Sequence, residues 1–119
     1  MSPASSNDIV QLEAAHLQEL RRGTVVVGAL LALRTPGYGY ALLDQLAIAG
    51  IDVDANTLYP LLRRLEAQGL LTSEWNTDES RPRKFYRTSD AGERLTATLL
   101  ADAQSTLEAL GRLAEGGTS

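Results

Sequence analysis

The cationic side chains of this chain gather in two short stretches. Arg63 and Arg64 are adjacent, and residues 81–87 (RPRKFYR) carry four cations and no acid. Arg and Lys neutralise phosphate groups and donate hydrogen bonds to them. The alternative is a solvated surface, on which Arg63 and Arg64 pair with Glu66 and nearby acids. The residues that we expect to bind phosphate are Arg63 or Arg64 or both, Arg81, Arg83 and Lys84.

Asn56, Thr57 and Tyr59 place three hydrogen-bonding side chains within four residues. Amide and hydroxyl groups suit nucleic-acid bases and phosphates because their hydrogen bonds are short and directional. The alternative is that they cap a helix, although Asp54 is available for that role.

Tyr38 and Tyr40 are further candidates for phosphate contacts through their hydroxyl groups, and of the two we expect Tyr38 on DNA. The alternative is that one of them fills the core beside Leu42 and Leu46.

Catalytic and metal chemistry find little support in this sequence. The chain has no Cys and a single His, His16. Thiolate nucleophiles, disulfides and Cys-ligated metals are therefore excluded, and His16 has no partner ligands. Asp52 and Asp54 form a carboxylate pair, but nothing in the sequence indicates that they act as a general acid and base, and they more naturally cap and solvate a turn. We expect no enzyme, no metal and no cofactor.

The length of 119 residues corresponds to about one domain. The net charge of −4 argues against a polyanion partner, but both ends of the chain are acidic and the middle is locally basic. The longest apolar run, residues 25–33, is much shorter than the roughly 20 residues that span a bilayer, and the N-terminus does not resemble a signal peptide. We expect a cytoplasmic protein with no membrane partner.

The elements that must position these side chains begin with a helix. Apolar residues recur at helical spacing from about residue 7 to residue 33, which predicts one long helix or two in tandem. Gly23 and the β-branched residues after it leave a strand over 24–31 as the alternative. Residues 35–37 (TPG) end this element.

A second helix is predicted at about 39–49, and a third runs from its N-cap Asp54 to about residue 68, with Gly69 at its C-terminal end. The third helix carries a stripe of leucines at 58, 61, 62 and 65 that should be buried. Two short strands follow at 70–76 and 83–88. They form a hairpin with a polar, turn-rich tip.

Ser89 is the predicted N-cap of a last helix. Three helices followed by a hairpin are the winged variant of the helix-turn-helix, in which the third helix enters the major groove and the hairpin contacts the DNA backbone. We therefore expect a mainly α fold with a small β-hairpin. The predicted domains are an N-terminal helical extension at 1–19, a winged helix-turn-helix at 20–88 and a C-terminal dimerisation helix at 89–115.

Four stretches of the sequence resemble one known family. They are LRRGT at 20–24, GYGYALL at 37–43, NTLYPLLRRLEAQGLL at 56–71, and RKFYR at 83–87 leading into SDAG at 89–92. Together they resemble the PadR-like transcriptional regulators over residues 20–95. The resemblance implies a dimeric bacterial repressor in which the N-terminal segment and the C-terminal helix pair across the two-fold axis and a small molecule releases the DNA. The last helix is short, as in the smaller members, and lacks the aromatic residue on which short relatives stack flat drugs.

The last helix also predicts a dimer from its own spacing. Apolar residues recur after three, four, three and four positions, which is a short heptad seam. The seam residues are Leu100, Ala103, Leu107, Leu110 and Ala114.

A small apolar or phenolic effector would bind where the first helix, the last helix and the base of the wing meet. The expected lining is Leu20, Val27, Trp75, Leu99 and Ala103. Trp75 has two interpretations, as the anchor that ties the wing to the body and as a wall of this pocket, and we expect the anchor.

These predictions combine into a homodimeric repressor that binds double-stranded DNA. Each copy would place helix 54–68 in one of two successive major grooves of a pseudo-palindromic operator, with half-sites ~34 Å apart. The alternative is a winged-helix module that binds another protein and no DNA, which the pI of about 4.9 permits. A gel shift on the promoter region of its own gene separates the two.

Overall fold

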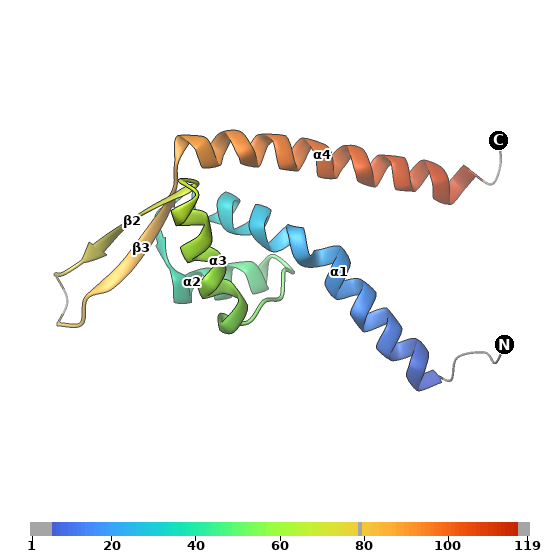
Figure 1. Cartoon of the computed structure of the whole chain (residues 1–119), viewed down its shortest axis with the longest axis horizontal. Coiled ribbons are helices and arrows are strands. Elements are labelled where there is room, and N and C mark those ends of the chain that lie inside the picture. Colours follow the sequence, from blue (N-terminus) through green and yellow to red (C-terminus); the bar gives the residue numbers. More distant parts are fainter. Residues whose placement is uncertain (1–5, 79, 117–119) are drawn as a thin grey trace.

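The computed structural model describes residues 6–78 and 80–116. Within them the chain forms four helices and a three-stranded antiparallel sheet (Figure 1). The elements in chain order are α1 (Ser6–Ala32), β1 (Gly37–Tyr38), α2 (Gly39–Ile48), α3 (Ala55–Ala67), β2 (Leu71–Asn76), β3 (Arg83–Thr88) and α4 (Asp90–Glu115). The predicted mainly α, winged-helix fold is confirmed.

α1 is a single α-helix of 27 residues, so the strand alternative for 24–31 is wrong. Its C-terminal part is the reason: Gly28, Ala29 and Leu30 are buried against the body, which outweighs the weak helix propensity of the Val-rich run. The Arg34 guanidinium then bonds the Glu93 carboxylate at 3.1 Å, joining the end of α1 to the start of α4.

The predicted caps form as expected. The Asp54 carboxylate accepts a hydrogen bond from the Thr57 amide at 2.8 Å, and the Ser89 hydroxyl accepts one from the Gly92 amide at 3.0 Å. Gly69 follows α3 with a φ of +77°, the left-handed conformation that ends helices at glycine. α3 and α4 therefore begin close to the positions that their sequences predict.

The sheet has the strand order β1-β3-β2. β2 and β3 pair along their full lengths, from Leu71 opposite Thr88 to Asn76 opposite Arg83. β1 adds two residues to the base of this hairpin, where Tyr38 lies opposite Phe85. The hairpin is the predicted wing, while β1 was not predicted.

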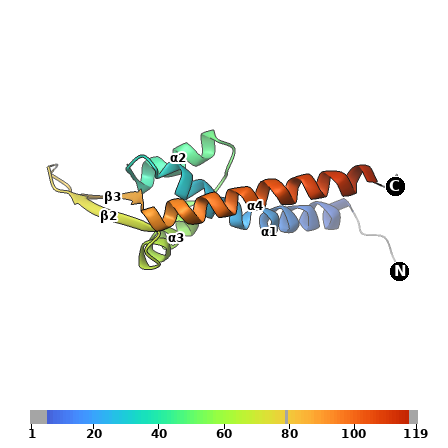
Figure 2. The ribbon, with the colours of Figure 1, turned by 90° about the horizontal axis from the view of Figure 1, so that it is seen from above.

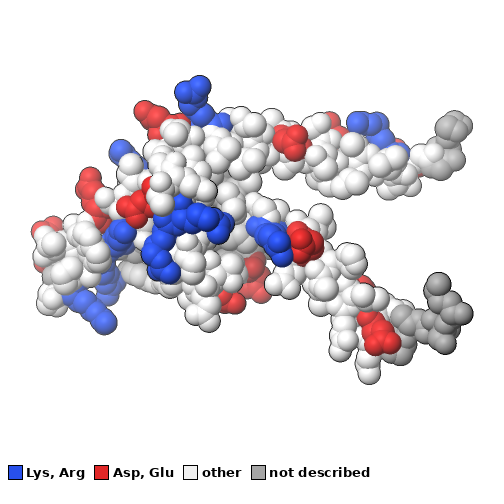
Figure 3. Space-filling model, in the orientation of Figure 1, with Lys and Arg blue, Asp and Glu red and all other residues white. Residues whose placement is uncertain are grey.

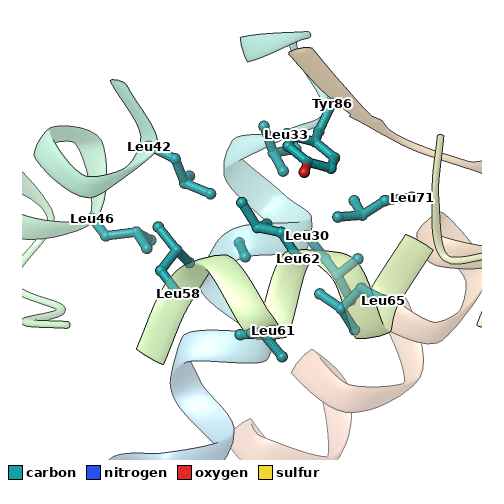
Figure 4. Packing of buried hydrophobic residues seen from close by; sticks show 11 residues of the cluster. Leu30, Leu33, Leu42, Leu46, Leu58, Leu61, Leu62, Leu65, Leu71 and Tyr86 are labelled. Carbon is teal, nitrogen blue, oxygen red and sulfur yellow. The ribbon is translucent and has the colours of Figure 1, made fainter. Parts of the chain in front are cut away.

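The core lies where α1, α2, α3 and the base of the wing meet (Figure 4). The leucine stripe of α3 is buried, as predicted, and Leu30 of α1 and Tyr86 of β3 pack with it. The side chains labelled in Figure 4 are Leu30, Leu33, Leu42, Leu46, Leu58, Leu61, Leu62, Leu65, Leu71 and Tyr86.

Two long helical arms leave this body on the side opposite the wing (Figure 1). The described part of α1 before residue 25 and most of α4 after residue 100 are exposed. The arms diverge in Figure 1 and overlap when seen from above, so they project in one plane (Figure 2). Among the described residues, no helix has both the length and the hydropathy needed to cross a bilayer.

Candidate nucleic-acid interface

The start of α3 exposes polar side chains. Asn56 and Thr57 are exposed, and Asp54 caps the helix, so the Asn56 amide is not needed as the cap. Tyr59 is half-buried and its ring lies against Gly39, where an added Cβ would come within 2.5 Å of a ring carbon. Of the three predicted contacts at this end of α3, Asn56 and Thr57 are therefore the most accessible.

Arg63 and Arg64 are exposed on the side of α3 away from its leucine stripe. Within the described residues, neither Arg side chain forms an ion pair with Glu66 or another acid. Glu66 is engaged by the wing instead. Two guanidinium groups on one helix face can therefore bind an anion without first breaking a pair.

Two tyrosines and an arginine form a cluster beside the wing. The Tyr38 and Tyr40 rings stack with centroids 5.7 Å apart, and Arg83 donates to the Tyr40 hydroxyl at 2.8 Å. Asn76 donates to the Tyr38 hydroxyl at 2.7 Å. Tyr38 is half-buried and Tyr40 exposed, so Tyr40 offers its hydroxyl to a ligand more readily than the predicted Tyr38 does.

Lys84 of the wing has an acidic partner within the body. Its ammonium group donates to Glu66 Oε1 at 2.9 Å, and the Ser73 hydroxyl donates to Glu66 Oε2. The hydrogen bonds from Ser73 and Lys84 lower the pKa of Glu66 below its ordinary value of 4.5. The hydrogen bond to Glu66 raises the pKa of Lys84 above 10.5. Both groups are therefore charged at neutral pH.

Cationic side chains lie over α3 and the wing, whereas the two arms carry few and scattered charges (Figure 3). Arg81 is exposed on the wing loop and Arg83 is exposed at the start of β3. The sequence indicated these cations, those of α3 and Tyr40, but it did not indicate Asn76. It offered Glu66 as a partner of Arg63 and Arg64, whereas Glu66 bonds Ser73 and Lys84 of the wing. The pairing of Asn76 with Arg83 across the hairpin could have been found from the strand register alone.

The prediction that Trp75 anchors the wing is wrong, because 63% of its surface is exposed. Trp75 lies across the hairpin from Lys84, one pair before the last pair of β2 and β3. The wing itself points away from the arms (Figure 1). The structure therefore does not bring Trp75 together with Leu20, Val27, Leu99 and Ala103. A shallow hollow of about 120 Å³ on the sheet has none of the five as its lining.

The side chains of the predicted heptad seam of α4 are largely exposed in the single chain. Leu100 is half-buried, while Ala103, Leu110 and Ala114 are exposed and Leu107 is 70% exposed. The apolar surface is wider than predicted, since Leu113 and several apolar residues of α1 are exposed as well. The exposed apolar residues of α1 are Ile9, Val10, Leu12, Leu17 and Leu20. Among the described residues, no cluster of His, Asp or Glu could hold a metal ion.

The sequence of the chain matches the model of the "Transcriptional regulator PadR-like family" over residues 29–98. The chain belongs to this family. It is 43% identical over 82 residues to the transcriptional regulator Rv3488 of Mycobacterium tuberculosis, covering 69% of this chain and 73% of the relative. The resemblance drawn from the residue motifs is thus confirmed.

Solved structures of PadR-like regulators share the fold. A PadR family transcriptional regulator from Eggerthella lenta superposes with a TM-score of 0.85 at 48% identity, over 91% of this chain and 96% of the other. A PadR-like transcription factor from Bacteroides fragilis superposes with a TM-score of 0.69 at 30% identity, over 83% of this chain and 98% of the other. The chain is a PadR-like transcriptional regulator with the fold of these solved structures.

Proposed function

We propose that this PadR-like regulator is a homodimeric, sequence-specific DNA-binding repressor that acts in the cytoplasm. Each copy places α3 in one of two successive major grooves of a pseudo-palindromic operator, with the wing on the adjacent backbone. The observation that carries this proposal is the exposed face of α3. Asn56 lies there beside an independent cap, and Arg63 and Arg64 have no acidic partner among the described residues.

The contacts divide by chemistry. Asn56 and Thr57 read base edges, since amide and hydroxyl groups match their donors and acceptors. The expected phosphate contacts position the protein without reading sequence, and they are Tyr38, Tyr40, Tyr59, Arg63, Arg64, Arg81 and Arg83. The negative total charge does not oppose this, because a locally basic face governs the approach of a polyanion.

The homodimer is supported by the shape of the chain. The radius of gyration is 18.2 Å, whereas a compact chain of this length has about 13.5 Å. The accessible surface is 8740 Å², whereas a compact monomer of 12.8 kDa exposes about 6,300 Å². The excess includes the apolar arms, and a second copy covers them along Leu100, Ala103, Leu107, Leu110 and Ala114.

Release by an effector belongs to the same proposal. A small apolar or phenolic ligand seated between the arms, near Leu20, Val27, Leu99 and Ala103, would favour a dimer whose two α3 helices are wrongly spaced. Only such a difference in affinity between two conformations can shift their populations.

DNA binding is tested by fluorescence anisotropy with a labelled duplex from upstream of the chain's own gene and a scrambled duplex of equal length. We expect the upstream duplex to bind about a thousandfold more tightly.

The salt dependence of binding tests the phosphate contacts. Three or four phosphates neutralised by each copy predict that the logarithm of the binding constant falls with the logarithm of the salt concentration with a slope of roughly −5 to −7. Asn56→Ala should reduce the preference for the upstream duplex over the scrambled one, and Arg63→Ala should weaken binding to both duplexes equally. No binding to either duplex would favour the protein-interaction alternative.

A further inference from the structure

One carboxylate, that of Glu66, connects three elements. It projects from α3, accepts the Ser73 hydroxyl of β2 on Oε2 and accepts the Lys84 ammonium group of β3 on Oε1 at 2.9 Å. The Lys84 and Glu66 side chains are 30% and 31% exposed, so the pair is partly shielded from water. Hydrogen bonds to a charged group are stronger than neutral ones, and here they bridge a helix and a hairpin.

The two wing residues lie on the same face of the hairpin. Ser73 is opposite Tyr86 and Lys84 is opposite Trp75, so the Glu66 carboxylate contacts two successive positions of the face that also carries buried Leu71. Beyond these positions the wing has only two strands, because β1 pairs only with Phe85 and Tyr86. A two-stranded ribbon is marginally stable alone, so its position depends on contacts with the body. Asn76 and Arg83 bond the hydroxyl groups of Tyr38 and Tyr40, and Ser73 and Lys84 bond Glu66, which is the one contact among these that joins the wing to α3.

Charge alone does not explain an acid at this place. A carboxylate beside a phosphate-binding helix repels DNA, and Lys84 loses its net attraction for phosphate when it is paired with Glu66. The arrangement is consistent with a role in geometry: the carboxylate holds the cations of the wing at a set distance from those of α3.

We propose, on the basis of the DNA-binding function proposed above, that Glu66 is a positioning residue that fixes the wing against α3. In this arrangement Lys84 serves DNA binding through Glu66 and contacts no phosphate itself. The pKa directions agree, because both members of the pair remain charged at neutral pH and the tie persists under physiological conditions.

The test compares two neutralised acids of the same region. Glu66→Gln removes the tie, and Glu74→Gln makes the same change in net charge at an exposed residue of β2. We expect Glu74→Gln to bind the upstream duplex as tightly as the native chain or more tightly. We expect Glu66→Gln to bind about tenfold more weakly, since each copy loses a contact worth a factor of a few. Equal affinity of the two variants would overturn the proposal.

A second measurement needs no DNA. Trp75 is the single Trp of the chain and lies across from Lys84, so its time-resolved anisotropy reports the mobility of the wing. We expect faster local motion in Glu66→Gln and in Lys84→Met, and native motion in Glu74→Gln. The exchanged pair Glu66→Lys with Lys84→Glu should restore slow motion, which a simple loss of packing would not. Unchanged Trp75 motion in all variants would show that Glu66 does not hold the wing and would overturn the proposal.

Lys84 itself is tested by the salt dependence. If it acts through Glu66, Lys84→Met weakens binding without changing the salt slope. If Lys84→Met makes the log–log salt slope of DNA binding less steep by about one for each copy, Lys84 contacts a phosphate and the proposal is contradicted. If the native chain binds no DNA, the proposed function fails, whereas the Trp75 measurement still decides whether Glu66 holds the wing.

Discussion

Gly92 lies where α4 leaves the sheet and packs directly on the backbone before β2. A Cβ at this position would come within 2.2 Å of the Leu70 carbonyl oxygen and 2.7 Å of the Thr88 methyl group. Backbone atoms cannot move aside cheaply, so Gly92→Ala should lower the free energy of unfolding by about 3 kcal/mol. Urea denaturation followed by circular dichroism measures this.

Gly111, in the same helix, is the matched control for that substitution. An added Cβ there meets nothing within 4 Å. Gly111→Ala should therefore raise the free energy of unfolding by about 0.5 to 1 kcal/mol through helix propensity. Similar effects at the two positions would contradict the close approach of α4 to Leu70.

Glu66 should make stability depend on pH in the acid range. The hydrogen bonds from Ser73 and Lys84 lower its pKa in the folded state, so its contribution is complete above the ordinary value of 4.5 and is lost as pH falls through the lower, folded value. Gln imitates the protonated acid. Glu66→Gln should therefore be less stable than the native chain at pH 7, by about 1 kcal/mol or less for a partly exposed pair.

That difference should shrink as the pH falls below 4.5. Thermal unfolding at one protein concentration over this range measures it. A difference that stays constant with pH would mean that the Glu66 carboxylate does not titrate as part of the pair.

At the scale of elements, α4 is the arm for which the apolar seam was predicted. Leu107 is 70% exposed in the single chain, and the proposed dimer buries it. Leu107→Asp would place an unpaired charge in that interface, so it should weaken dimerisation by at least about a hundredfold. Sedimentation equilibrium measures the effect. Ser105→Asp, on the opposite face of α4, should leave the dimer intact, and equal behaviour of the two variants would move the interface elsewhere.

The helices and the hairpin could be predicted because their signals are local. Asp54 and Ser89 cap α3 and α4 as their positions suggest, and Gly69 ends α3 in the left-handed conformation. β1 could not be predicted, because two residues become a strand only by pairing with Phe85 and Tyr86 of a distant segment.

Two features of the wing could not be predicted from sequence patterns. Alternation along β2 places Trp75 on the same face as buried Leu71, which suggests an anchor. Trp75 is nevertheless exposed, because it lies farther out along the hairpin than the residues that pack on the body. The tie between Glu66, Ser73 and Lys84 was also beyond prediction. It depends on strand register and on how α3 rests against the hairpin, and neither is encoded within one element.

The whole molecule is elongated, with principal extents of 61 × 34 × 24 Å. The wing lies at one end and the two apolar arms project from the other (Figure 1). In the proposed homodimer, the end of the chain that binds DNA is therefore separate from the end that binds the second copy. A change in how two copies pair along their arms would move the two α3 helices relative to each other. Under the proposed function, both operator binding and its release by a ligand would therefore depend on how the two copies pair.

Hydroxyl-radical footprinting of the native protein on the duplex upstream of its own gene tests the central claim most directly. A homodimer that places α3 in successive major grooves should protect two symmetric segments whose centres lie about 10 base pairs apart. The same protection should disappear with Leu107→Asp at protein concentrations where the native dimer is saturated. A single protected segment, or protection that is independent of the dimer, would contradict the account.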